Sequence, residues 1–259
     1  MEENLQRIKR NYPLLTIAIP TFNRPKLLKE AINSALNQST NKCYEIIIID
    51  NSFEETIVDN IDNLLKPFSQ FKNIQFYRNQ TNIGMFGNWN KCLQKAKGDY
   101  ITLLNDDDLL DYYFVENVLK DINGEGMLIY DYEIIYEQNN WKIIGGRIRD
   151  ILSKINFGNI QKIKLCNILF RNPSNGSLGV VVKKNNAISI GGYDHLHYPS
   201  ADYFFNFEYI KRFGGYKVRK KLCKYRFSVN ESQSIHCLLG FVNQDYLLRE
   251  KIFRESLKN

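Results

Sequence analysis

The stretch YEIIIID at residues 44–50 restricts the fold of this chain more than any other part of the sequence. Its apolar, β-branched residues follow one another without a polar position, so a strand built from them has no face suited to water. A strand covered on both faces stands in the centre of a parallel sheet, because helical crossovers pack above and below it. The stretch therefore predicts an α/β protein with a buried parallel strand.

Strand and helix patterns alternate on both sides of that stretch. The apolar runs LLTIAIP, IQFYRN and DYITLLN predict three further strands. Between them, PKLLKEAINSALNQ begins a helix at a proline, residues 55–66 form another helix, and GMFGNWNKCLQKAKG carries its apolar residues on one helical face. This alternation predicts an open, mostly parallel sheet with helices on both faces.

The pattern changes after about residue 125. Two strands around the turn EQNN are followed by a helical stretch near 150–170, the strand SLGVVVKK, the helix ADYFFNFEYIKRFG and the strand YKVRKKLCKYRFS. The last segment, FVNQDYLLREKIFRESLK, is amphipathic. We interpret it as core packing, with contact to a partner or a membrane surface as the alternative. Residues 126–259 should therefore end in a small helical and β extension of one continuous domain.

Charge, cysteine content and hydropathy exclude several classes of protein. No apolar run approaches the roughly 20 residues that cross a bilayer, and the acidic start of the chain is not a signal peptide. The five scattered cysteines lack the spacing of a zinc site and are expected to be free thiols of a cytosolic chain. The net charge of +7 indicates either a solvated basic face or an anionic partner such as a nucleotide diphosphate or a membrane surface. No nucleic-acid motif accompanies the charge, so we expect no nucleic-acid partner.

Three consecutive aspartates, Asp106, Asp107 and Asp108, follow the fourth predicted strand. Ligands of open α/β sheets bind beyond the carboxyl ends of the strands, where the polar residues after the first two strands also gather. Adjacent carboxylates repel one another, so either a pKa rises or a cation compensates their charge. Oxygen ligands suit Mg²⁺ or Mn²⁺ together with substrate phosphates. The alternative is a solvated turn in which Asp108 or Asp111 caps the next helix.

Several stretches occur together in a characteristic order: TIAIPTFNR, IIIIDNS, NQTNIGMFGNWNKCLQKAKGDYITLLNDDD, and GGYD followed by SADYFF. In this order and spacing they resemble the family 2 glycosyltransferases of the GT-A fold, closely over residues 14–112 and less closely over 176–213. The resemblance implies a mixed, mostly parallel central sheet flanked by helices. It also implies that residues 1–125 bind a nucleotide and that residues 126–259 bind sugar and acceptor.

The resemblance assigns nucleotide and metal roles to individual residues. It implies that the loops after the first two strands and the loop RNQTNIG hold the nucleotide, together with the acidic stretch, through Thr21, Phe22, Arg24, Asp50, Arg78, Asn82, Asn105 and Asp106. It implies that Asp107 is the direct ligand of Mn²⁺ or Mg²⁺ and that Asp106 is the second metal candidate.

The second half of the chain carries the implied base and the sugar contacts. The resemblance places the acceptor-activating base at Asp202 and the contacts to sugar and acceptor at Gly192, Asp194 and His195. Arg226 and His236 are candidates for phosphate or metal contacts, with an ordinary surface position as the alternative. Asp202 alone would also suit the first turn of a helix, where the helix dipole favours a carboxylate.

The chain departs from the family pattern at two positions. The metal motif, Asp-any-Asp, has Asn105 in first place, which offers a neutral oxygen without charge, so Asp106 is expected to take the ribose or water-mediated role. Ala201 precedes the implied base where the family often has Glu. These departures leave open whether activity is reduced or altered.

The resemblance implies an inverting, metal-dependent glycosyltransferase. The donor would be a nucleotide-diphosphate sugar, with UDP as the leading nucleotide, and the acceptor a saccharide or lipid-linked hydroxyl, as in the synthesis of surface polysaccharide or glycolipid. We expect a cytoplasmic protein, with peripheral contact to the inner face of the membrane as an option. The alternative is a nucleotide-sugar binding or nucleotidyltransferase-like protein, although PTFNRPKLL lacks the glycine-rich signature expected of a nucleotidyltransferase.

Overall fold

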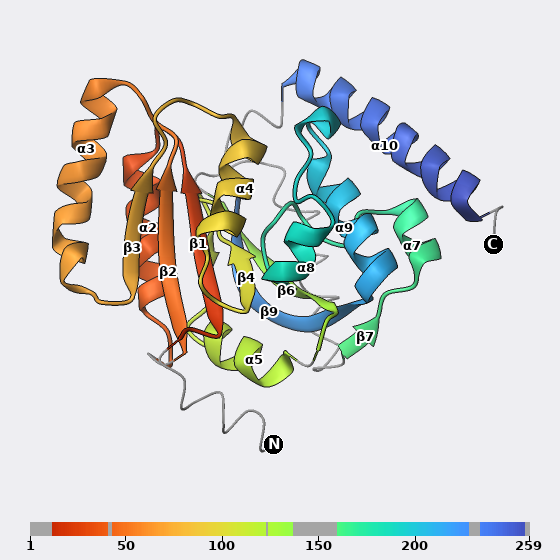
Figure 1. Cartoon of the computed structure of the whole chain (residues 1–259), viewed down its shortest axis with the longest axis horizontal. Coiled ribbons are helices and arrows are strands. Elements are labelled where there is room, and N and C mark those ends of the chain that lie inside the picture. Colours follow the sequence, from red (N-terminus) through yellow and green to blue (C-terminus); the bar gives the residue numbers. More distant parts are fainter. Residues whose placement is uncertain (1–11, 41–42, 123, 137–159, 228–233, 257–259) are drawn as a thin grey trace.

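The computed structural model describes residues 12–40, 43–122, 124–136, 160–227 and 234–256 (Figure 1). The second strand expected after the turn EQNN lies outside the described residues. The helix expected near 150–170 lies partly outside them. Its described part contains a strand, β7 (Ile160–Lys162), and a short helix, α7 (Leu165–Phe170), instead of one continuous helix.

The centre of the molecule is a sheet of nine strands. Besides β7 it consists of β1 (Leu15–Thr21), β2 (Tyr44–Asp50), β3 (Ile74–Arg78), β4 (Tyr100–Leu103), β5 (Leu109–Leu110), β6 (Met127–Tyr136), β8 (Val180–Lys183) and β9 (Gly215–Phe227). The order is β3-β2-β1-β4-β8-β6-β9-β5, with β7 paired to β9. Strands β1 to β4 are parallel neighbours, whereas β8 runs antiparallel to β4 and β6. The expected parallel half and the mixed character of the sheet are therefore both confirmed.

Strand β2 is buried on both faces, as its sequence predicts. Because side chains alternate along a strand, Ile46 and Ile48 join one core and Ile47 and Ile49 join the other. All four are fully buried, and burial of such a side chain stabilises a fold by about 1.5–3 kcal/mol. This strand thus holds the two layers of helices together.

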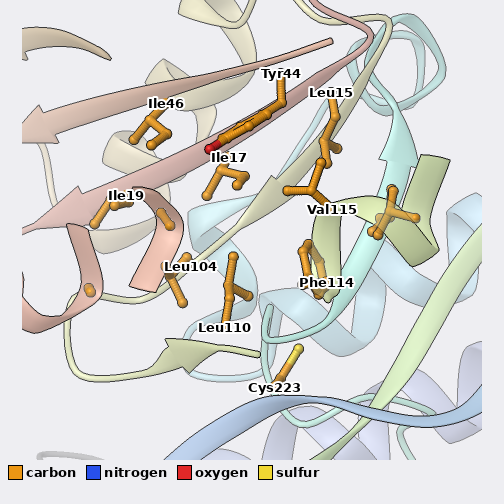
Figure 2. Packing of buried hydrophobic residues seen from close by; sticks show 14 of the residues in the cluster. Leu15, Ile17, Ile19, Tyr44, Ile46, Leu104, Leu110, Phe114, Val115 and Cys223 are labelled. Carbon is orange, nitrogen blue, oxygen red and sulfur yellow. The ribbon is translucent and has the colours of Figure 1, made fainter. Parts of the chain in front are cut away.

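One layer of helices consists of α2 (Pro25–Leu36), α3 (Glu55–Leu65) and α5 (Phe114–Asp121). Figure 2 shows this core, in which Ile17 and Ile19 of β1 lie near Leu104 and Phe114. The other layer contains α4 (Met85–Lys95) and α9 (Ala201–Phe213). The shorter helices are η1 (Lys66–Gln70), α8 (Lys184–Ser189) and η2 (His195–His197).

The last helix, α10 (Ile235–Ser256), lies at the outer side of α9 and α7 (Figure 1). Leu248 and Ile252 are buried in the second core, which confirms core packing for one face of this segment. The other face exposes Leu239, Val242 and Tyr246. Over the described part of the chain, none of the helices combines the length and hydropathy that a bilayer crossing requires.

The parallel register brings three strand ends to one edge of the sheet. Thr21 at the end of β1 is paired with Asp50 at the end of β2, and the backbone N–H of Leu104 donates to the Ala18 carbonyl at 2.9 Å. The loop that begins at Asn105 therefore leaves the sheet beside the loop after β1. This edge is where the sequence predicts the functional residues.

Candidate functional site

A cleft of about 940 Å³ lies at this edge of the sheet. Part of its lining comes from the loops after β1, β2 and β4, and includes Thr21 and Asp107. Another part comes from residues 172–176, the first turn of α9 and helix α10, and includes Asp202. A pocket of about 600 Å³ between α2, α3 and η1 has no carboxylate in its lining. The larger cleft is therefore the candidate site.

Asp106 joins the ends of β1 and β4. Thr21 Oγ1 donates to Asp106 Oδ2 at 2.7 Å, and the backbone N–H of Phe22 donates to the same oxygen at 3.3 Å. Burial raises the pKa of Asp106 to about 6, the charge of Asp107 adds to the rise, and the bond from Thr21 opposes it. Asp106 Oδ2 thus holds the end of β1 through hydrogen bonds, and Asp106 Oδ1 lies 3.6 Å from Arg24 Nη1.

Asp107 and Arg24 form an ion pair in the cleft. Arg24 Nη1 donates to Asp107 Oδ2 at 2.7 Å, and 39 % of the Arg24 side chain is exposed. The guanidinium offsets part of the repulsion between the two neighbouring carboxylates. Arg24 lines the cleft beside the acidic residues, and its expected contact with base or ribose stays a prediction.

Asn105 and Asp108 lie deeper, between the acidic loop and the second half of the chain. Asn105 Nδ2 donates to Asp108 Oδ2 at 3.1 Å, and Asn105 Oδ1 accepts from Ser177 Oγ at 3.1 Å. The backbone N–H of Arg226 donates to Asp108 Oδ1 at 3.0 Å. Burial raises the pKa of Asp108 to about 7, and the charge of Asp107 adds to the rise. Asp108 does not cap a helix, because α5 begins at Phe114 after Tyr113.

The predicted nucleotide residues after β2 divide between the cleft and the interior. Asp50 is fully buried, with one oxygen accepting from Arg78 Nε at 2.9 Å and the other from the Ser52 N–H at 2.9 Å. Neither Asp50 nor Arg78 lines the cleft, whereas Asn82 does. Asn82 Oδ1 accepts from Asn51 Nδ2 at 2.6 Å, so Asn51 holds the loop before α4. Asp50 therefore holds Arg78 and the loop after β2 from inside the fold.

Asp202 lies in the first turn of α9 and faces the cleft. Asn172 Nδ2 donates to Asp202 Oδ2 at 2.7 Å. Burial raises the pKa of Asp202 to about 6, the bond from Asn172 opposes the rise, and the nearby carboxylate of Asp245 adds to it. A carboxylate with this pKa is ionised at neutral pH and can still accept a proton efficiently.

The three expected sugar and acceptor residues lie outside the cleft lining. Gly192 has φ +70°, and a Cβ there would lie 2.3 Å from Asn90 Oδ1, so this glycine is required by packing against α4. Asp194 Oδ1 accepts from the Leu196 N–H at 2.9 Å and caps η2. The His195 side chain is 83 % exposed. The structure does not bring this trio to Asp202, and the contacts assigned to it stay predictions.

Arg226 and His236 have different surroundings. Arg226 is buried, its Nε donates to the Asp107 carbonyl at 2.9 Å, and its guanidinium pairs with Glu30. It therefore supports the acidic loop from behind and does not line the cleft. His236 is an exposed residue near the start of α10, outside the cleft lining.

Sequence reasoning missed several residues of the site. Asn51 belongs to the polar residues after the second strand, which the sequence places at the ligand edge without giving this residue a role. Asn172 and Ser177 belong to the polar turn sequence RNPSNGS, which by itself indicates only a loop. Phe241 and Asp245 line the cleft from α10, a segment that the sequence assigns to core packing or to contact with a partner or membrane surface, not to the site. These residues reach the site through tertiary contacts that have no local pattern.

A family model described as glycosyl transferase family 2 matches residues 16–180. A GalNAc(5)-diNAcBac-PP-undecaprenol beta-1,3-glucosyltransferase of Campylobacter jejuni is 38 % identical over 99 residues, which are 38 % of this chain and 31 % of that protein. An uncharacterized glycosyltransferase of Haemophilus influenzae is 26 % identical over 221 residues, 85 % of this chain and 70 % of that protein. Three of the similar curated proteins are matched over only 31–38 % of their own length.

Solved structures with the same fold include residues 1-349 of S. aureus TarS. The complex of that protein with UDP-GlcNAc has a TM-score of 0.65 at 15 % identity and matches 94 % of this chain and 71 % of that chain. Its complex with UDP has a TM-score of 0.59 at 16 % identity, over 83 % of this chain and 60 % of that chain. At these identities the likeness shows the fold, which is that of a GT-A glycosyltransferase.

Proposed function

Because the chain belongs to glycosyl transferase family 2, we propose that it transfers a sugar from a nucleotide-diphosphate sugar to a hydroxyl acceptor. The observation that carries this proposal is the shared cleft, in which Asp106 and Asp107 lie at the strand ends and Asp202 lies on α9. A protein that only bound a nucleotide sugar would have no use for a partly desolvated carboxylate in the same cleft.

We propose UDP as the nucleotide of the donor. The support is that the TarS structures of the same fold contain UDP and UDP-GlcNAc. Thr21, Phe22 and Asn82 line the cleft at the strand ends and are available to base and ribose. Phe22 is 40 % exposed and stacks on Phe53, which leaves an aromatic surface beside the loop.

A divalent cation, Mn²⁺ or Mg²⁺, is a further part of the proposal. Asp106 and Asp107 fit such an ion, because Mg²⁺ commonly takes one or two carboxylates and completes its shell with waters and phosphates. Across the described ranges, no group of three or more potential metal-binding side chains comes together. Substrate phosphates would therefore supply the remaining ligands. When bound, the ion would neutralise charge on the departing diphosphate.

Asp202 is the proposed general base. Its carboxylate takes the proton of the acceptor hydroxyl while that oxygen attacks the anomeric carbon and the bond to the diphosphate breaks. A single displacement of this kind inverts the anomeric configuration. Arg24 lies beside Asp107 and is a cationic side chain in the cleft lining, so it is placed to meet phosphate charge.

We further propose a saccharide or lipid-linked acceptor, as in the synthesis of surface polysaccharide or glycolipid. The support is the C. jejuni relative, whose name describes a glucosyltransferase acting on a lipid-linked saccharide. Peripheral contact with a membrane would agree with the net charge of +7 and with the exposed apolar side chains of α10. Sedimentation with vesicles of anionic and of neutral lipid would test this contact.

The test of the proposed function is incubation with a panel of UDP-, GDP- and dTDP-sugars, with Mn²⁺, Mg²⁺ or EDTA. We expect release of nucleoside diphosphate from one class of donor, and transfer when a suitable acceptor is present. Release of pyrophosphate or of sugar 1-phosphate would indicate the nucleotidyltransferase-like alternative. Calorimetric binding without any turnover, in the presence of diverse acceptors, would indicate a binding protein.

A further inference from the structure

The side chain of Asn172 lies between the candidate base and the body of α9. Its Nδ2 donates to Asp202 Oδ2 at 2.7 Å, and its Oδ1 accepts from Asn206 Nδ2 at 2.9 Å. Asp202 and Asn206 are four residues apart, so they lie on one face of the helix and both reach the same amide. Asn172 thus connects successive turns of α9 from outside the helix.

The orientation of the Asn172 amide is fixed by its partners. Asn206 is 1 % exposed and its Nδ2, which can only donate, also donates to Ser174 Oγ at 2.7 Å. The Ser174 N–H donates to Asn172 Oδ1 at 3.3 Å. With its oxygen committed to donors, the Asn172 amide must turn its nitrogen toward Asp202. The network therefore supplies a permanent hydrogen-bond donor to the carboxylate.

We propose that Asn172, oriented by Asn206, is the positioning residue of the general base Asp202. Its N–H group holds Asp202 Oδ2 and favours the ionised form of the carboxylate, which is the form that takes the acceptor proton. This inference rests on the proposed function of the same cleft. It adds a requirement for two asparagines, one of which, Asn172, lies in a loop far from α9 in the sequence.

Two other titratable groups near Asp202, a carboxylate and a phenol, do not stabilise its negative charge. Asp245 of α10 is a like charge whose Oδ1 accepts from Ser200 Oγ at 3.1 Å, with Arg249 behind it at 4.0 Å. Tyr193 is a buried phenol next to Asp202 and Cys92, and burial raises its pKa far above neutrality. Neither group compensates a negative charge on Asp202. Among the interactions that favour the ionised carboxylate and lower the pKa of Asp202, the bond from Asn172 is the largest.

Asn172→Leu tests the proposal, because leucine keeps the branched shape of the side chain and its number of heavy atoms but has no donor. A hydrogen bond to a charged group is strong enough to shift a pKa by about one to two units. We therefore expect the pH profile of kcat/KM for the nucleotide-sugar reaction to change, with the midpoint of its acid limb about one pH unit higher. We expect kcat to fall by about tenfold or more, with little change in KM for the donor. Asn206→Leu should show the same shift, weakened, because it acts only through the orientation of the amide.

Asn117→Leu is the matched control, since Asn117 lies on the surface of α5 and donates to the Tyr113 carbonyl outside the cleft. It should leave the acid limb unchanged. If Asn172→Leu lost the same fraction of kcat at every pH, with no shift in the acid limb of the kcat/KM profile, the proposal would be overturned. Thermal unfolding of each variant identifies any that has failed to fold. In that case Asn172→Ser, a smaller change that can still donate weakly, should give an intermediate shift.

A readout without turnover separates this inference from the proposed function. The Asp202 carboxyl of ¹³C-labelled protein can be titrated by NMR and assigned by its disappearance in Asp202→Asn. We expect the Asp202 titration to move up by about one unit in Asn172→Leu and to stay in place in Asn117→Leu. An inactive wild type with that shift would refute the proposed function, although it would show that Asn172 controls the ionisation of Asp202. An active wild type with an unmoved titration would refute the inference alone.

Discussion

Replacement of the candidate base by its neutral isostere, Asp202→Asn, should abolish transfer and at the same time stabilise the fold. The pKa of Asp202 is raised from 3.8 to about 6, so the folded chain binds this proton more tightly than the unfolded chain does. Above about pH 6 the ionised carboxylate therefore destabilises the fold, and the penalty vanishes as the pH falls through 3.8. The difference corresponds to about 3 kcal/mol at 1.36 kcal/mol per pKa unit.

Solvent in the cleft reduces this figure, because Asp202 is only partly covered. We expect Asp202→Asn to gain about 1–2 kcal/mol at pH 8, which is a rise in Tm of about 2–8 °C for a domain of this size. The gain should shrink steadily toward pH 4. Differential scanning fluorimetry between pH 4 and pH 8, together with urea unfolding at both ends of the range, measures it.

Asp59→Asn on the exposed surface of α3 is the control, and its Tm should follow the wild type at every pH. An Asp202→Asn variant that is inactive but no more stable than the wild type at pH 8 would refute the reasoning. A stabilisation that is the same at pH 4 and pH 8 would refute it equally, because the carboxylate charge would then not be its cause. The wild type should lose about nine tenths of its kcat/KM between pH 7 and pH 5, as Asp202 becomes protonated.

Three further predictions concern the other residues of the cleft. Arg24→Gln should weaken binding of UDP by about tenfold at low salt, measured by calorimetry, with a smaller effect at high salt because the interaction is electrostatic. Asn105→Asp should lower the free energy of unfolding by about 1–3 kcal/mol in urea titrations, because Asp108 loses a donor and gains a like charge 3.1 Å away. Gly192→Ala should destabilise by about 1–3 kcal/mol, because its Cβ would meet Asn90 Oδ1 at 2.3 Å and its φ of +70° is strained for alanine. A Gly192→Ala protein with wild-type unfolding would show that the loop adjusts without strain.

The sequence predicted the parallel half of the fold well because its signals are local. Four buried isoleucines in β2 have no other stable arrangement than a strand with covers on both faces. The rule that ligands bind at the carboxyl ends of such strands then located Thr21 and Asp107 in the cleft. The family resemblance added Asp202, which the helix pattern alone did not distinguish from an ordinary first-turn carboxylate.

The second half was predicted less completely because its contacts are distant. Strand β6 pairs in parallel with β9, and β8 lies antiparallel between β4 and β6, an order that no local pattern specifies. The burial of a side chain cannot be predicted from its place near a strand end either. Asp50 ends β2 and is fully buried against Arg78, whereas Asp107 follows β4 and lines the cleft. Asp245 reaches the cleft only because α10 folds back over α9 (Figure 1).

The departure at Asn105 has a physical reason that the motif alone does not reveal. Its amide donates to Asp108 and accepts from Ser177, a combination that an ionised aspartate cannot provide because it has no donor. The loop that carries Ser177 also carries Asn172, which holds Asp202. A neutral residue at position 105 thus links the acidic strand end to the loop that contacts the proposed base. The asparagine therefore has a structural role of its own at this position and is not by itself evidence of lost catalysis.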